Sequence, residues 1–579
     1  MTTTTMRMMM MIQSGNSKHD DVSSTSDSFA SLPVEDCVYR GEGNANIVVS
    51  LPHEQRVIRF RKSLPGEASP DDDKIRVKRE VEFVRHVVSG YLGSYVRIPE
   101  IVRYDAKDVA ELLEIIRPFR PEERREKKNV KDYAMKMADY AFLPLNFANL
   151  DPDSFRSEST FAVEIKPKQG YQCEEEQRLQ KCPYCLTQYY KLKKKVITAR
   201  SSYCPFDLFS GDRERMKRAI EGLLKSPQNN LKIFKDGSIV YDQGFPTDDV
   251  ENVLTDWRQS IDVSTKESNV NLFCNMTCTA LLHSFPQSER SKVPRVTSES
   301  NRAYRMFDGR DSEVPDDINA ELIAKARKLL SRVQEECKRD GKNLPQDCVL
   351  ERILSMQRLP YAGTRHVYDI YEKYATLIND EFVYARLINC TQECSEQREE
   401  KMRCPRVAST YPFSKSPQKE HEDRNGNHCT DVDWSIVGNV ENEHGLINNS
   451  NIWKMNSSCN NEYVDESNNE NVKYDSDKTY DDIINNDDLL LLQNYLLFCT
   501  ARDCSILITF RQLNPEAVSN VPLEYVIKVS EDLYFLANIS VSDLDPKSMH
   551  TIAKHRRRDA NVLNSVISLL ENEESLLNS

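Results

Sequence analysis

A long segment rich in Asn and Asp divides the chain and limits what the rest of it can build. Residues 421–490 contain 16 Asp and Glu against 4 Lys and Arg, so they hold −12 of the formal net charge of −13. Because the segment lacks clustered apolar residues, it is typical of a disordered insertion, which we place at 415–488. The fold must then be assembled from both flanking parts, which are nearly neutral overall and can hold a basic pocket.

The length of 579 residues is too great for one compact core, so more than one lobe is expected. A tail at 1–33, rich in Met, Thr and Ser, has no apolar period and is predicted to be disordered. We expect an N-terminal lobe at 34–138 and a second lobe in two parts, 139–414 and 489–575. No run of about eighteen apolar residues occurs, so a membrane span is not expected, and the N-terminus has no signal-peptide pattern.

Two glycines one residue apart form the first chemical signal. Gly41 and Gly43 lie between predicted strands, where backbone N–H groups can approach phosphate oxygens closely. Because the third glycine of a nucleotide-binding loop is absent, an ordinary hairpin turn also fits. Arg59 follows inside the strand predicted at 56–60, where protein kinases place a lysine on the nucleotide phosphates. A solvated strand arginine is the alternative. Apolar spacing at 74–88 predicts a helix packed on this sheet.

The second signal is Glu164-Ile165-Lys166-Pro167-Lys168. Residues 161–168 begin as a strand that must stop at Pro167, and alternation predicts that Glu164, Lys166 and Lys168 share one face. Two cations this close repel each other, which is tolerable if a polyanion lies between them. A solvated edge strand is the alternative.

Two aspartates form the third signal. Asp503 precedes a predicted strand at 504–510, and Asp543 follows one at 534–541. A phosphoryl-transfer enzyme needs one carboxylate to take a proton from the attacking hydroxyl and another to hold Mg²⁺. Each aspartate alone also fits a turn or a helix cap. Apolar periodicity predicts further helices at 216–224, 321–333, 489–501 and 561–570, and a strand at 525–529. Residues 110–116 and 133–143 each predict a strand or a short helix.

Taken in order, these motifs resemble the inositol-pentakisphosphate 2-kinase family. The resemblance is carried by Tyr-Arg-Gly-Glu-Gly-Asn-Ala-Asn at 39–46, Arg-Val-Ile-Arg at 56–59, Glu-Ile-Lys-Pro-Lys at 164–168, Asp-Leu-Phe-Ser-Gly at 207–211, Pro-Gln-Asn-Asn at 227–230, Arg-Asp-Cys-Ser-Ile at 502–506 and Asp-Leu-Asp-Pro-Lys at 543–547. It implies an α+β, two-lobed, protein-kinase-like fold with a mainly antiparallel sheet in the N-terminal lobe. It also implies phosphorylation of the 2-hydroxyl of inositol 1,3,4,5,6-pentakisphosphate by ATP, giving inositol hexakisphosphate (phytate).

The resemblance assigns a role to each matching residue. Gly41, Gly43 and Asn44 would lie in the loop over ATP, Arg59 on its phosphates, and Asp139 and Tyr140 in the hinge beside adenine. Asp503 would be the catalytic base and Asp543 the Mg²⁺ ligand. The implied inositide and phosphate clamp consists of Arg120, Lys166, Lys168, Lys191, Asn229, Asn230, Lys232 and Lys547.

The chain departs from the family pattern in two places. Thr187-Gln188 stands where a His is expected before the glutamine, so a substrate contact there is in doubt. Plant members hold a zinc through His and Cys. Here Cys390, Cys394 and Cys404 cluster without a well-spaced His, and Cys173, Cys182 or Cys185 is a conceivable fourth ligand. Zinc is therefore not expected, and the sixteen irregularly spaced cysteines are read mainly as reduced thiols.

Two other functions were weighed. A non-catalytic inositol-polyphosphate-binding scaffold would keep the cations and lose the base or the metal carboxylate, yet Asp503 and Asp543 are both present. A protein kinase would need His-Arg-Asp and Asp-Phe-Gly, and neither tripeptide occurs. The basic run 554–558 fits a nuclear import signal, a pocket rim or a solvated helix face. We expect a monomer in the nucleus and cytoplasm, with no membrane or nucleic-acid partner.

Overall fold

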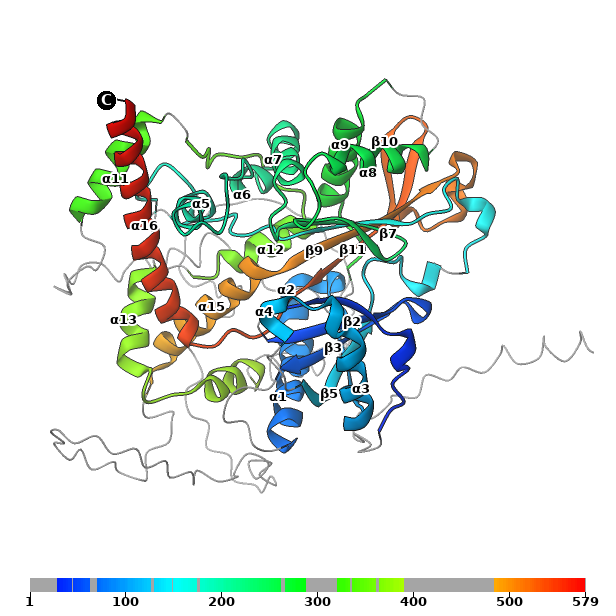
Figure 1. The fold of residues 1–579 in the computed structure, drawn as a ribbon, viewed down its shortest axis with the longest axis horizontal. Helices are drawn as coiled ribbons and strands as arrows, with labels where there is room; N and C mark the ends of the chain where they lie inside the picture. Colours follow the sequence, from blue (N-terminus) through cyan, green and yellow to red (C-terminus); the bar gives the residue numbers. More distant parts are fainter. Residues whose placement is uncertain are drawn as a thin grey trace, which may run out of the picture. The chain divides into compact units, whose positions relative to one another are not determined.

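The structure, a computed structural model, describes residues 29–43, 45–62, 70–125, 130–147, 149–173, 177–261, 266–287, 320–333, 336–360, 364–389 and 484–577. These residues contain two antiparallel sheets and many helices, which confirms the predicted α+β class (Figure 1). All the elements below belong to one compact unit of the chain, made of residues 1–397 and 480–579. No helix among the described residues is both long and apolar enough to cross a bilayer.

The first sheet has five strands in the order β1-β2-β3-β5-β4, and every neighbouring pair is antiparallel. Its strands are β1 (Val38–Glu42), β2 (Asn46–Leu51), β3 (Arg56–Lys62), β4 (Glu100–Arg103) and β5 (Val130–Ala138). In β3, Ile58 and Phe60 are buried and alternate with less buried residues, because successive side chains of a strand point to opposite faces. The predicted strand, glycine turn and two further strands are therefore confirmed.

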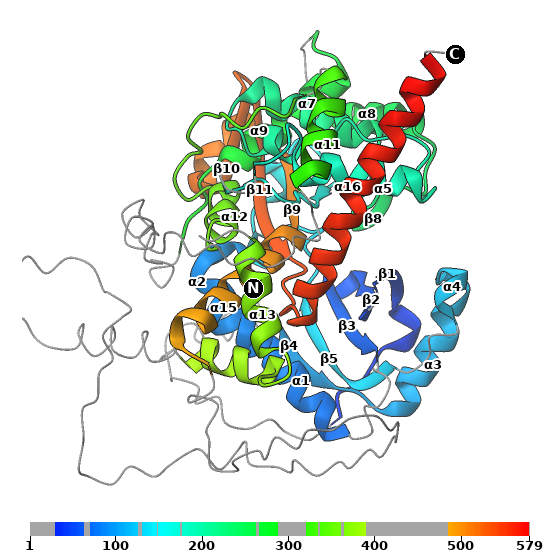
Figure 2. The same cartoon turned by 90° about the vertical axis from the view of Figure 1, so that its left-hand side faces the viewer.

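Helices cover both faces of this sheet. Helix α1 (Pro70–Glu82) packs on one face and α3 (Ala106–Ile116) on the other, and the short helix α4 (Glu122–Arg125) precedes β5. Helix α1 continues as a π-helical turn (Phe83–Val88) and then as α2 (Ser89–Leu92), whose buried residues belong to a separate, larger core cluster. Ala134 of β5 packs in one core cluster with α3, whereas its neighbours Tyr133 and Met135 pack in another with α1. Figure 2 shows α1 and α3 on either side of β5. The helix predicted at 74–88 is confirmed, and residues 110–116 are a helix.

The second sheet has six strands in the order β10-β11-β9-β6-β7-β8. Its strands are β6 (Phe161–Ile165), β7 (Leu231–Lys235), β8 (Ser238–Tyr241), β9 (Ser505–Leu513), β10 (Val526–Ser530) and β11 (Leu533–Ser542). Although β6 and β9 come from opposite sides of the predicted insertion, they pair directly with each other. The two flanking parts therefore build one sheet, whose central strand β9 is buried along almost its whole length.

The register of three strands brings distant residues together. Ile165 at the end of β6 pairs with Ile506, and Ser505 at the start of β9 pairs with Ser542 at the end of β11. Because both pairs are antiparallel, the residues that follow β6 and β11 lie beside those that precede β9. Lys166, Asp503 and Asp543 consequently meet at one end of the sheet.

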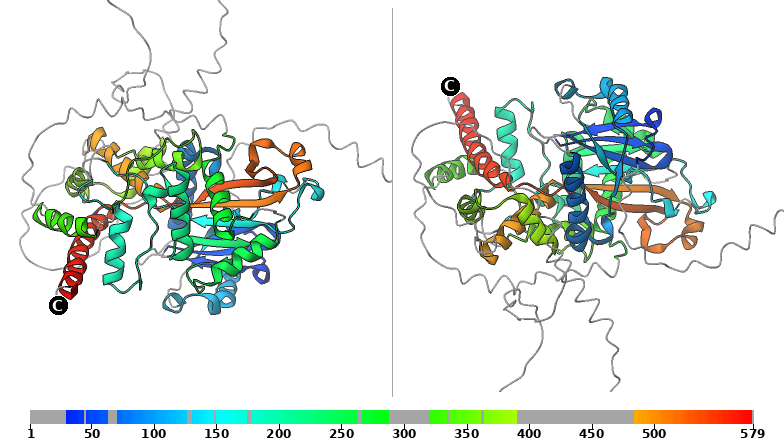
Figure 3. Two further views of the ribbon diagram at one scale, coloured as in Figure 1. Left: turned by 90° about the horizontal axis from the view of Figure 1, so that it is seen from above. Right: turned by 90° about the horizontal axis from the view of Figure 1, so that it is seen from below.

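Helices pack around the second sheet in a large core. They are α5 (Pro183–Lys193), α6 (Pro205–Leu208), α7 (Arg213–Lys225), α8 (Asp249–Gln259), α9 (Asn269–Leu282), α11 (Ala320–Arg332), α12 (Val349–Gln357), α13 (Thr364–Tyr374), α15 (Asn486–Asp503) and α16 (His550–Leu577). The four helices predicted from periodicity in this part correspond to α7, α11, α15 and α16. A smaller apolar cluster joins α5, α11 and α16, and both views of Figure 3 show α16, in red, beside α11, in green.

Both predicted disordered segments, 1–33 and 415–488, include a few residues that belong to the fold. Ala30 forms a bridge with Tyr104, and Leu32 is buried in the core of the first sheet, so the last residues of the predicted tail belong to the fold. At the other segment, Ile484 is buried and α15 begins at Asn486. Apolar side chains that reach a core explain both corrections. Residues 1–28 and 390–483 lie outside the described residues.

Candidate active site

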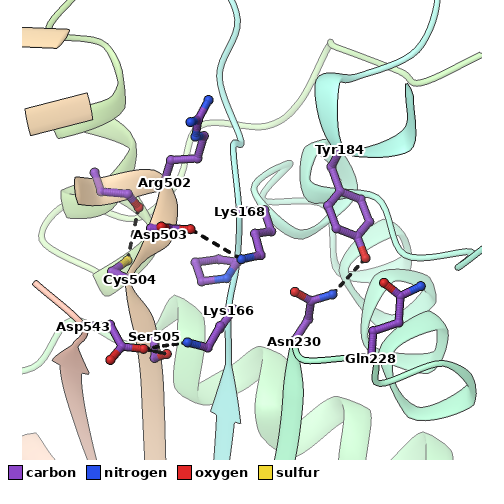
Figure 4. A network of polar contacts seen from close by, with 12 residues as sticks. Lys166, Lys168, Tyr184, Gln228, Asn230, Arg502, Asp503, Cys504, Ser505 and Asp543 are labelled. Atoms are coloured by element: carbon purple, nitrogen blue, oxygen red, sulfur yellow. Dashed lines mark hydrogen bonds and ion pairs between the residues drawn. The ribbon is translucent and has the colours of Figure 1, made fainter. Parts of the chain in front are cut away.

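Three lysines and two aspartates meet at the end of the second sheet. Lys166 Nζ donates to Asp543 Oδ2 at 2.6 Å, and Lys168 Nζ lies 3.7 Å from Asp503 Oδ1 (Figure 4). Lys547 Nζ donates to Asp503 Oδ2 at 3.3 Å. We call these five residues the lysine–aspartate centre. The structure thus joins the two predicted carboxylates with lysines of two predicted motifs.

The backbone of this centre is unusual at two positions. Lys168 has φ of 62° and Asp543 has φ of 60°, both in the left-handed region. Strand alternation was the basis for placing Glu164, Lys166 and Lys168 on one face, but β6 ends at Ile165 and Lys168 turns left-handed, so the alternation does not extend to the two lysines. A left-handed non-glycine residue costs about 1–2 kcal/mol and persists only where its surroundings hold it.

The lysines keep both carboxylates ionised. Burial would raise the pKa of Asp503, but Lys547, Lys168 and Arg502 outweigh it and hold the pKa at about 2. Burial also opposes ionisation of Asp543, yet Lys166 and Arg59 hold its pKa well below the ordinary value. Conversely, burial lowers the pKa of Lys168 to about 8, although Asp503 acts in the opposite direction. At neutral pH the centre therefore holds two full negative charges.

Glu164, which belongs to the same motif as Lys166 and Lys168, is linked to the centre through Ser505. The Ser505 hydroxyl lies 2.9 Å from both Glu164 Oε1 and Asp543 Oδ2, and its single proton can serve one of them at a time. Lys232 Nζ lies 3.8 Å from Glu164 Oε2. Ser505 therefore links the motif glutamate to the predicted metal ligand, and Glu164 keeps Lys232 close to the site.

The remaining predicted clamp residues of the second sheet behave differently from one another. Lys191 Nζ donates to Gln228 Oε1 at 3.1 Å, and burial lowers its pKa. Asn229 is exposed in the turn before β7. Asn230 is buried, and its amide donates to the Tyr184 hydroxyl at 2.9 Å (Figure 4). The Nδ2 of Asn230 is thus turned toward Tyr184, while its buried Oδ1 has no hydrogen-bond partner among the described residues, and the implied contact with the inositide stays a prediction.

The predicted nucleotide residues cluster on the first sheet. The N–H of Gly43 donates to the carbonyl of Asn46 at 3.0 Å, and Gly41 has φ of 152°, which favours glycine. Asn44 lies outside the described residues. Arg59 forms an ion pair with Asp545, two residues after the predicted metal ligand. The arginine expected on ATP phosphates is thus tied to the same motif that carries Asp543.

Two residues that were predicted to contact a ligand, Arg120 and Asp139, form hydrogen bonds with other groups of the protein. Arg120 donates to both carboxylate oxygens of Glu42 at 3.0 and 3.1 Å, beside the glycine turn, and its implied role in phosphate binding stays a prediction. The Asp139 carboxylate accepts hydrogen bonds from Arg40 at 2.8 Å, Ser50 at 3.2 Å and the N–H of Ala141 at 3.0 Å.

These three bonds leave the Asp139 side chain little capacity for adenine. The carbonyl of the neighbouring Tyr140 accepts from the Thr509 hydroxyl at 2.5 Å, which ties the end of the first sheet to β9. The hinge role of the two residues stays a prediction.

Two further features of the sequence, the departure at Thr187 and the basic run 554–558, form local contacts within the fold. The Thr187 hydroxyl donates to the carbonyl of Pro183 at 2.8 Å, within its own helix. In the basic run 554–558, His555 is buried and receives a hydrogen bond from Arg502 at 2.7 Å, while Arg556 pairs with Glu372. The run is therefore not a uniformly solvated helix face.

A cluster of four cysteines was not foreseen as a set. The Sγ atoms of Cys182, Cys185, Cys204 and Cys337 all lie within 4.8 Å of one another, with 3.9 Å between Cys182 and Cys204. The sequence predicts Cys182 or Cys185 only as a conceivable fourth zinc ligand. The Cys-x-x-Cys spacing of these two residues is the one sequence pattern that indicates the cluster. The trio Cys390, Cys394 and Cys404 lies outside the described residues, and Cys173 is not a member of the cluster.

Comparison with known proteins agrees with this geometry. A family model described as inositol-pentakisphosphate 2-kinase matches residues 39–561. A Danio rerio protein named inositol-pentakisphosphate 2-kinase is 29% identical over 364 residues, which cover 58% of this chain and 69% of that protein. A Drosophila melanogaster protein of the same name is 25% identical over 300 residues, which cover 35% of this chain and 48% of that protein.

The Oryza sativa subsp. indica inositol-pentakisphosphate 2-kinase IPK1 is 30% identical over 238 residues, which cover 36% of this chain and 53% of that protein. The chain thus aligns with about half the length of the fly and rice proteins. The family model, in contrast, spans most of the chain and includes every residue of the lysine–aspartate centre. The chain therefore belongs to the inositol-pentakisphosphate 2-kinase family, whose name denotes kinases that transfer phosphate to an alcohol group.

Proposed function

We propose that the lysine–aspartate centre transfers the γ-phosphate of ATP to the 2-hydroxyl of inositol 1,3,4,5,6-pentakisphosphate. The observation that carries this proposal is the pairing of two ionised carboxylates with two lysines of one motif, at 2.6 and 3.7 Å. The substrate carries many negative charges, so charge-assisted bonds to lysines and arginines must supply most of its binding energy. The reaction itself needs alignment, a metal ion and one base.

Asp503 is the proposed base. In the free protein Lys168 and Lys547 hold its pKa at about 2, which makes the carboxylate a weak proton acceptor. A polyanionic substrate attracts the same two lysines, and their departure lets the pKa of Asp503 rise toward its ordinary value. Because a base works best when its pKa lies near the working pH, substrate binding itself would activate Asp503.

Asp543 is the proposed ligand of the Mg²⁺ that the family resemblance implies. Its Oδ2 is engaged by Lys166 and Ser505, whereas its Oδ1 forms no hydrogen bond or ion pair with the described residues, and the side chain is 42% exposed. A carboxylate oxygen with a free face is the kind of ligand that Mg²⁺ prefers, so the residue fits the ion. Bound there, Mg²⁺ would neutralise charge on the nucleotide phosphates.

A two-lobed, kinase-like arrangement is proposed for the described part of the chain. Its support is the first sheet, in which five antiparallel strands pack against α1. Arg61 of β3 also lies 2.5 Å from the buried Glu80 of α1. In protein kinases a β3 lysine pairs with a helix glutamate in the same way. Gly41, Gly43 and Arg59 would then face the nucleotide. A binding scaffold without catalysis is disfavoured, because both carboxylates are present and ionised.

We also propose that the four-cysteine cluster holds a zinc ion, contrary to the expectation from the sequence, which centred on Cys390, Cys394 and Cys404. Tetrahedral zinc with Zn–S bonds of about 2.3 Å separates its sulfurs by about 3.8 Å, and Cys182 and Cys204 lie 3.9 Å apart. Cys182 caps the N-terminus of α5, the helix that carries Lys191. A zinc here would anchor α5 to the segments around Cys204 and Cys337.

The Asp503→Asn variant tests the proposed base. Turnover of Mg-ATP and inositol pentakisphosphate to hexakisphosphate should fall about 10²–10⁴-fold, because no carboxylate remains to take the proton. Nucleotide binding, measured by calorimetry, should stay close to wild type. Asp256→Asn, which removes an ordinary surface ion pair with Lys235, is the matched control. Near-normal turnover by Asp503→Asn would exclude it as the base. A wild-type protein that makes no hexakisphosphate would contradict the reaction itself.

The pH dependence of substrate affinity tests Lys168. Below its pKa of about 8 the amine is charged, and above it the charge is lost. The kcat/KM for inositol pentakisphosphate, which reports the free enzyme, should therefore fall as the pH rises through about 8. Lys168→Arg, which stays charged over this range, should flatten that decline. Identical pH profiles for wild type and Lys168→Arg would show that Lys168 does not bind substrate.

Metal analysis tests the zinc proposal. Protein purified without added metal should contain about one zinc per chain, measured by mass spectrometry. Cys204→Ser should lower the zinc content and the melting temperature, because one of four ligands is lost. Cys274→Ser, which changes a buried thiol of α9 outside the cluster, should keep the zinc. Wild-type protein that is metal-free even after incubation with zinc would refute the site.

A further inference from the structure

A buried glutamine connects the chain segment that carries Lys168 with the segment that carries Asp503. Gln357 is the last residue of α12 and is 1% exposed. Its Nε2 donates to the carbonyl of Lys168 at 2.9 Å and to that of Ala501 at 3.4 Å, and its Oε1 accepts from the N–H of Gly170 at 2.7 Å. Both donor hydrogens and the acceptor oxygen of the amide are thereby used.

Two of these bonds hold the strained loop that follows β6. Lys168 keeps its left-handed backbone only if its neighbours over-determine it. Gln357 fixes the carbonyl of Lys168 and the N–H of Gly170, which lie on either side of Gln169. The Tyr203 hydroxyl donates to the carbonyl of Pro167 at 2.6 Å. A Cβ on Gly170 would lie 2.1 Å from the Phe209 ring, so the loop has no room to slide.

The third bond reaches the segment that presents the proposed base. Ala501 lies in the last turn of α15, two residues before Asp503. The thiol of Cys504 also donates to the Ala501 carbonyl, at 3.2 Å. One side-chain amide therefore holds the loop that carries Lys168 and the helix end that carries Asp503, although these residues lie on opposite sides of the predicted insertion.

We propose that Gln357 is a positioning residue, which sets the relation between Lys168 and Asp503 without touching the reactants. Gln fits this position because it offers two donors and an acceptor on one rigid plane. Ionised Glu has no donor, and Met has the length but neither a donor nor a comparable acceptor. The inference rests on the proposed function of the two residues that Gln357 holds, and it assigns the amide a role in alignment.

The principal test is Gln357→Met in the full-length chain. The kcat/KM for inositol pentakisphosphate should fall about 10²-fold, the loss expected when a reacting group moves by about 1 Å. The KM for ATP should stay near wild type, because Gln357 makes no contact with the first sheet. Gln493→Met is the matched control, since Gln493 is also a buried glutamine near this core and donates to the Val383 carbonyl at 3.0 Å. It should keep wild-type kinetics.

A double-mutant cycle separates positioning from general destabilisation. If Gln357 acts through Lys168, then Gln357→Met should cost less in a Lys168→Ala background than in wild type. Gln357→Glu adds a second signature. Its neutral form can donate one hydrogen bond and its ionised form none, so its activity relative to wild type should rise as the pH falls.

Three results would overturn the proposal. They are wild-type kcat and KM per folded Gln357→Met molecule, an equal loss with and without Lys168, and a Gln357→Glu activity ratio that does not change with pH. A failure of the proposed function is distinguishable from these. If wild type makes no hexakisphosphate, the affinity for inositol pentakisphosphate can still be measured by calorimetry. A lower affinity in Gln357→Met would show that the variant weakens binding by Lys168.

Discussion

The antiparallel pairing of β6 with β9 and of β9 with β11 is the constraint on which the site depends. Through this register, the end of one strand, the start of the second and the end of the third converge, although their residues are far apart in the chain. A slip of one residue in either pair would turn every side chain of a strand to the opposite face. The buried length of β9 opposes such a slip, because its apolar side chains would lose their core positions.

Charge explains why the centre is stable before any ligand arrives. Three lysines close together repel each other, and burial penalises the charged forms of Lys166 and Lys168, as the lowered pKa of Lys168 shows. Asp503 and Asp543 offset this cost by pairing with them, and Ser505 and Glu164 extend the network. The same carboxylates are the groups to which we assign chemistry. The two aspartates thus neutralise the lysines of the folded protein and also carry the proposed chemistry.

Local sequence patterns predicted the elements that hold the site. The apolar run of α15 and the strand β9 are visible in sequence, and so are the aspartates that flank β9 and β11. Left-handed Lys168 was not predictable, because its backbone is held by Gln357, which is distant in sequence. The motifs alone could not predict that Asn230 bonds to Tyr184 and Arg120 to Glu42, because these partners are distant in the sequence. Cys337 joins its cluster only through the tertiary fold.

The lysine–aspartate pairs also bear on how the reaction ends. Lys168 and Lys547 already have a carboxylate partner, so a polyanion bound as we propose would replace that partner and would not fill a vacant site. The electrostatic gain on binding is then only the difference between two pairings. After phosphate transfer, the product has more negative charge than the substrate and would be retained by an isolated cluster of lysines. Asp503 competes for both ammonium groups, so on the proposed function these resting ion pairs would act as an internal displacing ligand that favours product release.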